Sequence, residues 1–140
     1  MKNPIYTCLW FDGKAQEAAQ FYCSVFKNSQ IVSVSPMVTI FELNERKFMA
    51  LNGGPKFKFN ESVSFVIDCD TQEEIDYYWQ NLTESGTESR CGWLKDKFGV
   101  SWQVVPTILG SLMGNVEKAP RVVEAFMKMK KFDIQTLLNA

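Results

Sequence analysis

The first half of the chain alternates short apolar runs with one segment whose apolar residues recur at helical spacing. Residues 5–11 (IYTCLWF) predict a buried strand, because β-branched and aromatic residues fill them. Residues 14–26 predict an amphipathic helix, with Asp12 as its candidate N-cap. Three further strands are predicted at about residues 30–35, 37–43 and 47–51. The predicted order is therefore βαβββ.

The second half shows the same order of patterns. Residues 62–70 (SVSFVIDCD) predict a strand, and Thr71 with Glu74 forms a T-x-x-E capping box ahead of a helix. A strand near residues 87–91 leads into a hairpin, CGWLKDKFGVSWQVVP, whose Gly99 is expected to adopt a positive φ. The two halves are therefore predicted to be a repeated βαβββ module.

Fixed sequence offsets relate the two halves. An offset of 57 takes the helix positions Ala18, Phe21, Tyr22 and Val25 to Ile75, Tyr78, Trp79 and Leu82. Applied to the first strands, it takes Tyr6 to Val63 and Trp10 to Ile67, whereas an offset of 53 takes Ala50 to Gln103. These offsets predict which strand residues occupy equivalent places in the two modules.

The last predicted strand of the second module carries an uncharged amide between apolar neighbours. Val100, Trp102 and Val104 are expected on one face, and Ser101, Gln103 and Val105 on the other. Gln103 is therefore either an incidental buried polar residue or a marker of a site. Residues 107–140 predict a helical tail, with Pro120 in the first turn of one helix and Asp133 as a cap of another.

Composition narrows the possible functions. The net charge is −1 and no basic stripe is present, so we expect no nucleic-acid partner. No apolar run approaches the roughly 20 residues that span a bilayer, and no signal peptide is recognisable, so we expect no membrane partner. The four cysteines are widely spaced and form no CxxC pair, which is typical of reduced thiols in a cytoplasmic protein.

The chain contains no histidine. This excludes serine–histidine and cysteine–histidine catalysis, and histidine-based zinc and iron sites. Carboxylates alone could still hold magnesium or calcium. We found no glycine-rich loop between a strand and a helix that would predict a nucleotide or S-adenosylmethionine site, so no cofactor is predicted.

Five segments together resemble a known family: LWFDGKAQEAAQFYCSVF, FMALNGGP, DTQEEIDYYW, the hairpin quoted above and MKMKKFDI. They are similar to PhnB-like proteins, described as 3-demethylubiquinone-9 3-methyltransferase-like, of the vicinal-oxygen-chelate superfamily, which includes glyoxalases and bleomycin-resistance proteins. The resemblance covers nearly the whole chain. It implies an α+β fold of one domain, residues 1–140, in which paired βαβββ modules (about 4–55 and 60–106) form a curved mixed sheet around a cavity, usually within a homodimer.

Superfamily enzymes hold a metal on the first and last strands of each module. The resemblance carries these positions to Tyr6, Ala50, Val63 and Gln103. Alanine and valine have no donor atom, and a phenol or an amide replaces imidazole or carboxylate poorly. We therefore predict no metal site.

The resemblance and the offsets predict a cavity of mostly apolar and aromatic residues, which is the usual make-up of a small-molecule pocket. The alternative is a filled core. The predicted lining comprises Tyr6, Cys8, Trp10, Phe48, Ala50, Asn52, Val63, Phe65, Ile67, Ser101, Gln103 and Val105.

Three functions remain open at this stage. The first is metal-independent binding of an apolar or aromatic molecule. The second is an enzyme of the methyltransferase-like type, for which Tyr6 and Cys8 are candidate bases. The third is a non-catalytic dimeric interaction protein.

Overall fold

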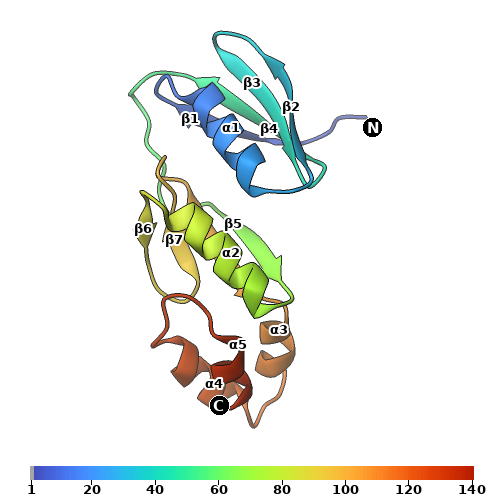
Figure 1. Cartoon of the computed structure of the whole chain (residues 1–140), viewed down its shortest axis with the longest axis vertical. Helices are drawn as coiled ribbons and strands as arrows, with labels where there is room; N and C mark the ends of the chain where they lie inside the picture. Colours follow the sequence, from blue (N-terminus) through green and yellow to red (C-terminus); the bar gives the residue numbers. More distant parts are fainter. Residues whose placement is uncertain (1) are drawn as a thin grey trace. The chain divides into compact units, whose positions relative to one another are not determined.

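The computed structural model describes residues 2–140 and divides into two compact units, one ending at Phe59 and the other running from Asn60 to Ala140 (Figure 1). Each unit is described by itself below. No helix among residues 2–140 is both long enough and apolar enough to cross a membrane.

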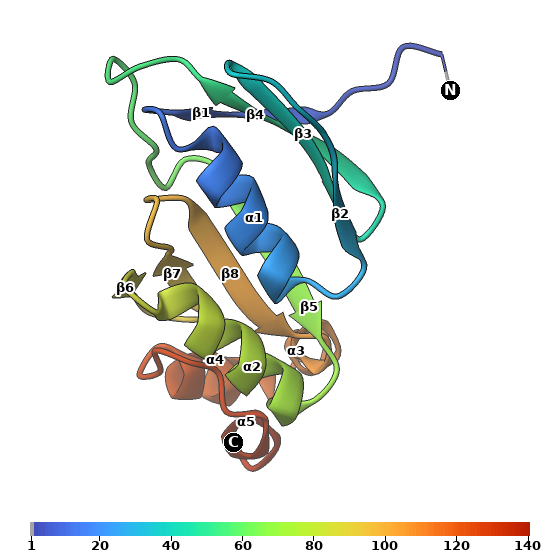
Figure 2. The same ribbon diagram turned by 45° about the horizontal axis from the view of Figure 1, so that its top comes forward.

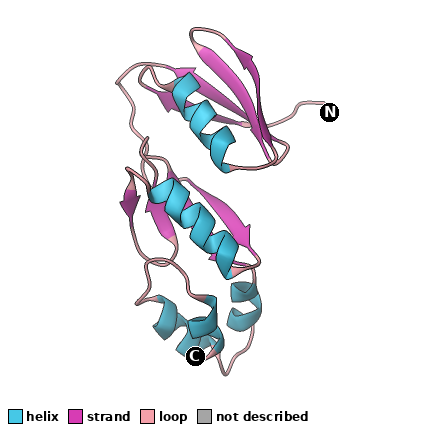
Figure 3. Ribbon diagram, in the orientation of Figure 1, coloured by secondary structure: helices cyan, strands magenta, loops and turns pink. Residues whose placement is uncertain are grey.

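The first unit packs one helix against a four-stranded mixed sheet (Figure 3). The sheet has the order β1-β4-β3-β2, in which β1 and β4 are parallel and the other pairs are antiparallel. Its elements are β1 (Thr7–Phe11), α1 (Ala15–Val25), β2 (Ser29–Val34), β3 (Val38–Leu43) and β4 (Arg46–Asn52).

Aromatic stacking joins α1 to its sheet. The ring of Tyr22 stacks on Phe41 at 6.1 Å, and Phe41 stacks on Phe48 at 5.2 Å. Ala18 and Ala19 are completely buried, so the helix lies close to the strands. These apolar contacts form the core of the first unit, and burying such rings is its main source of stability.

The second unit repeats this arrangement, with sheet order β5-β8-β7-β6 (Figure 2). Strands β5 and β8 are parallel, and Ile75, Trp79 and Leu82 form the buried stripe of α2. Its elements are β5 (Ser64–Cys69), α2 (Gln72–Thr83), β6 (Thr87–Glu88), β7 (Trp93–Lys95) and β8 (Ser101–Pro106). The predicted α+β fold with two βαβββ units is confirmed, and neither sheet closes into a barrel.

The helical tail packs on the second unit. It comprises α3 (Ile108–Met113), α4 (Ala119–Phe126) and α5 (Ile134–Leu138). The Gln72 amide donates to the carbonyl of Phe132 and accepts from the amide of Ile134, and the Lys131 ammonium lies 2.7 Å from the Asp76 carboxylate. The predictions for Pro120 and Asp133 are confirmed, whereas α3 was not expected.

The two main helices begin differently. The predicted capping box is confirmed, since Thr71 and Glu74 satisfy each other's backbone amides. The prediction that Asp12 caps α1 is wrong. Lys14 is the N-cap residue, and the side-chain oxygen of Asn52, at the end of β4, accepts from the amide of Ala15 at 2.8 Å. A long-range contact thus replaces the local cap.

Candidate functional site

Each sheet has one face that packs on its helix and one face opposite it, and the opposite faces are the candidate sites. In the first unit this face carries Cys8, Trp10, Ile40, Met49 and Leu51. In the second unit it carries Ser64, Val66, Asp68, Trp93, Lys95, Ser101, Gln103 and Val105. The predicted alternation along β8 is confirmed, with Trp102 and Val104 buried on the α2 side.

The register of the first sheet corrects the predicted lining. Ala50 pairs with Leu9, not with Cys8, and both Ala50 and Phe48 are buried on the α1 side. Met49, the partner of Cys8, lies on the face opposite α1 instead. Cys8 and Trp10 therefore do not share a face with Phe48 and Ala50.

Two further residues predicted to line the cavity have other contacts in the first unit. Asn52 serves as the cap of α1. Tyr6 precedes β1, and its ring lies 4.0 Å from the Lys47 ammonium, in a cation–π contact.

The second sheet requires the same correction. Phe65 pairs with Trp102 and Ile67 with Val104, so both lie on the α2 side. The strand partner of Gln103 on the face opposite α2 is Val66. Val63 precedes β5 and is 66% exposed. Of the predicted residues in this unit, Ser101, Gln103 and Val105 share that face.

One residue in a connecting loop explains why Val63, Phe65 and Ile67 were assigned to the wrong face. The ladders end at equivalent pairs, Phe11 with Asn52 and Cys69 with Pro106, so the strand offsets are 58 and 54. The helix offset of 57 holds, because the buried stripe of α1 maps onto that of α2. The strand-to-helix loop of the second module is therefore one residue shorter. A shift of one residue moves every strand side chain to the other face.

Gln103 is held by a neighbour on the same face. Its amide nitrogen donates to Ser64 Oγ at 3.0 Å, across the β5–β8 pair. Ser101, two residues earlier on β8, is 1% exposed, and within residues 2–140 its hydroxyl is the buried side-chain polar atom left without a hydrogen-bond partner. This face thus presents a small uncharged polar group of Ser64, Ser101 and Gln103.

The charged residue beside this group is paired. Lys95 occupies the register position next to Ser101, and its ammonium lies 3.0 Å from the Glu61 carboxylate. The hydrogen bond from Lys95 lowers the pKa of Glu61 below its ordinary value. Both side chains are partly exposed, so this pair contributes little to stability.

The sheet face opposite α1 is more aromatic. Trp10 donates its indole N–H to the carbonyl of Gly54 at 2.9 Å, and Phe57 meets the indole edge-on at 4.9 Å. Cys8 lies on the same face and is exposed, and partial desolvation raises the pKa of its thiol. The loop after β4 therefore returns to cover Trp10.

The donor set does not fit the metal that the family resemblance implies. Within residues 2–140, no three histidine, cysteine, aspartate or glutamate side chains gather as a metal-binding group. With the corrected register, the equivalent strand positions are Cys8, Met49, Val66 and Gln103. A thiol, a thioether, an alkyl group and an amide do not make the nitrogen and carboxylate shell that divalent catalytic ions take.

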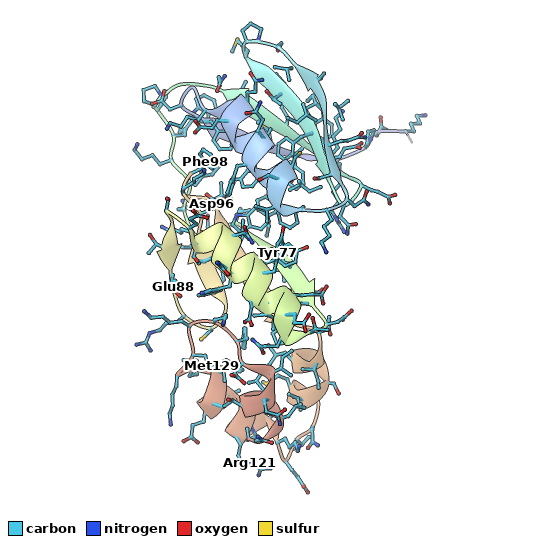
Figure 4. All side chains as sticks on the ribbon, viewed as in Figure 1. Tyr77, Glu88, Asp96, Phe98, Arg121 and Met129 are labelled. Carbon is cyan, nitrogen blue, oxygen red and sulfur yellow. The ribbon has the colours of Figure 1, made fainter. Side chains whose placement is uncertain are left out.

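Asp96, in the turn between β7 and β8, has a structural role that was not predicted (Figure 4). Its carboxylate is 3% exposed and accepts from the amides of Phe98 and Val100 and from the indole of Trp102. An aspartate whose carboxylate accepts a hydrogen bond from the backbone amide two residues later is a recognisable turn signal. The carboxylate fixes the hairpin that presents Ser101 and Gln103.

Comparison with known proteins identifies the family of this chain. Residues 3–105 match the model of the family described as 3-demethylubiquinone-9 3-methyltransferase. The chain belongs to this family. A relative of known structure is a putative 3-demethylubiquinone-9 3-methyltransferase, PhnB protein, from Bacillus cereus. It is 35% identical over 75% of this chain and 100% of its own, with a TM-score of 0.70. No match was found among curated proteins.

More distant structures share the family's fold. The fosfomycin resistance protein FosX from Listeria monocytogenes, complexed with Mn(II) and sulfate, is 9% identical over 83% of this chain and 98% of its own, with a TM-score of 0.60. A glyoxalase-related enzyme from Fulvimarina pelagi is 11% identical over 75% and 88%, with a TM-score of 0.53. These two structures share the fold alone, whereas the family predicted from the sequence is confirmed by the family model and by the Bacillus cereus relative.

Proposed function

We propose that this family member binds a small apolar or aromatic molecule on a sheet face opposite its helix, without a metal ion. The observation that carries the proposal is the composition of the β5–β8 face. There an uncharged hydrogen-bonding group of Ser64, Ser101 and Gln103 lies next to Val66 and Val105. A few polar groups among apolar ones are typical of small-molecule sites.

Gln103 and Ser101 would orient the ligand. One N–H of the Gln103 amide is engaged by Ser64, so its carbonyl oxygen and its second N–H are the groups offered to a ligand. The Ser101 hydroxyl can either donate or accept. A ligand bonded to Ser101 would relieve the penalty of about 1–3 kcal/mol for an unpartnered buried hydroxyl.

A thermal-shift screen of aromatic and hydrophobic compounds, run in chelator, tests the proposal. A compound at 100 times its Kd stabilises a protein by about 2.7 kcal/mol, so genuine ligands raise the Tm measurably. The Gln103→Leu variant should weaken the best compound, whereas Asp12→Asn, which alters an exposed loop, should not. A screen without a stabilising compound would overturn the proposal.

A second candidate function is the methyl transfer named in the family description. It requires an S-adenosylmethionine site and a base, for which the sequence offered Tyr6 and Cys8. Burial raises the pKa of Cys8 and so reduces its thiolate fraction at neutral pH. Calorimetric binding of S-adenosylmethionine at micromolar concentration would favour this candidate over ours.

We also propose that the protein acts as a homodimer in the cytoplasm. The resemblance to PhnB-like proteins supports the dimer, and four free cysteines support a reducing compartment. Light scattering after size-exclusion chromatography measures the dimer mass directly. A dimer that binds none of the screened compounds would instead favour the third candidate, a non-catalytic interaction protein.

A further inference from the structure

We infer that the position over the Trp10 indole, filled here by the ring of Phe57, binds a flat aromatic anion. The inference goes beyond the proposed function and concerns a site within the first unit alone. The occupant is an aromatic ring, because the chain itself supplies a phenyl ring at this place.

Contacts within the first unit fix the position of the Trp10 indole. Its indole N–H is bonded to the carbonyl of Gly54. A Cβ atom added to Gly53 would collide with the indole ring, so glycine allows the backbone to lie directly against it. The indole is therefore a preformed aromatic surface that needs no reorganisation to receive a ring.

Phe57, in contrast, is held weakly. Its ring is 56% exposed and meets Trp10 edge-on at 4.9 Å. An aromatic pair of this kind contributes only about 0.5–1.5 kcal/mol beyond area burial. A ligand ring that covers more of the indole can displace Phe57.

The strap that carries Phe57, residues 53–59, is anchored at both ends independently of that ring. The amides of Gly53 and Gly54 donate to the carbonyl of Phe11 at 2.9 and 3.3 Å. At the other end, the ring of Phe59 packs on Phe11 at 5.4 Å. Phe57 can therefore leave Trp10 by a local change within the strap while both anchors persist.

The charge of the strap determines the sign of the ligand. It carries Lys56 and Lys58 and no acidic residue. The Lys56 ammonium lies 5.4 Å from the centroid of the Phe57 ring. An aromatic ring that replaced Phe57 would meet the same ammonium, which favours a carboxylate or another anionic substituent on that ring.

The test compares three probes by calorimetry: 2-naphthoate, the uncharged 2-naphthamide and the saturated decahydro-2-naphthoate. Phe57→Ala should tighten 2-naphthoate binding about threefold to tenfold, because the competing ring is gone. Trp10→Leu should weaken 2-naphthoate by a similar factor and leave the saturated acid nearly unchanged. Circular dichroism checks that each variant is folded.

A lysine pair supplies the matched control for charge. Lys56→Gln should weaken 2-naphthoate a few-fold but not 2-naphthamide, whereas Lys58→Gln, the same change two residues away, should leave both unaffected. Phe57→Ala with unchanged or weaker binding would overturn the inference. So would equal affinities for the aromatic and saturated acids.

The failure of this inference differs from the failure of the proposed function. If none of the three probes and no compound of the wider screen stabilises the wild-type protein or Phe57→Ala, both are wrong. If compounds bind and Gln103→Leu weakens them, but no aromatic acid binds in a way that depends on Phe57 or Trp10, only the position over Trp10 is wrong.

Discussion

Ser101 and Ser64 occupy paired positions on neighbouring strands but have opposite energetic roles. The Ser64 hydroxyl accepts from Gln103, whereas the buried Ser101 hydroxyl lacks a partner. A buried polar group without a partner costs free energy, and such groups often mark functional sites. Stability measurements on variants of the two serines can therefore distinguish a hydroxyl that stabilises the fold from one that does not.

We predict that Ser101→Ala is neutral or stabilises the free protein by up to about 1 kcal/mol, because it removes an unsatisfied hydroxyl. Ser64→Ala, the matched change, should destabilise it by about 1 kcal/mol through loss of the Gln103 hydrogen bond. Urea denaturation measures both. A loss of more than 1 kcal/mol in Ser101→Ala would show that the hydroxyl has a stabilising partner after all.

Asp96 is the residue on which the β7–β8 hairpin depends most. Asp96→Ala leaves the amides of Phe98 and Val100 and the Trp102 indole without their acceptor, so we predict a loss of about 3 kcal/mol or more. Asp96→Asn retains one acceptor oxygen and should lose less. Thermal unfolding provides the measurement, with the exposed Asp12→Ala expected within about 0.5 kcal/mol of wild type.

The elements were predictable where periodicity dominates. The helical stripes through Tyr22 and Trp79 and the alternation along β8 follow from local pattern and are confirmed. The face of the first strand of the second module was not predictable, because a one-residue difference in a loop is invisible to a pattern comparison but reverses the pleat. The cap of α1 by Asn52 was missed for another reason, since it spans 37 residues and leaves no local signal.

At the scale of elements, the tail is joined to α2 by a titratable contact. Hydrogen bonds from Lys131 and then Gln72 lower the pKa of Asp76. Because the folded-state pKa lies below the unfolded value of about 3.9, the contact stabilises the protein above that value and is lost as the pH falls through the folded pKa. Both side chains are partly exposed, so the effect is small.

We predict that NMR titration of the Asp76 carboxyl carbon gives a pKa below about 3.9, and that Lys131→Gln raises it toward that value. Lys130→Gln changes the neighbouring charge without touching the contact and should have a much smaller effect. An Asp76 pKa that is unchanged in Lys131→Gln would show that the tail does not dock through this pair in solution.

At the scale of the whole molecule, the chain belongs to the 3-demethylubiquinone-9 3-methyltransferase family and shares its fold with a fosfomycin resistance protein complexed with Mn(II). Its own strand positions carry Cys8, Met49, Val66 and Gln103 in place of a metal-binding set. Our central claim is that the fold here serves small-molecule binding without a metal.

The most direct test is calorimetry of the best compound from the screen, performed in chelator and again in excess Mn²⁺. We predict the same Kd in both conditions, and weaker binding in both for Gln103→Leu. Binding that appears only when the metal is added, with one metal ion per chain, would contradict the claim.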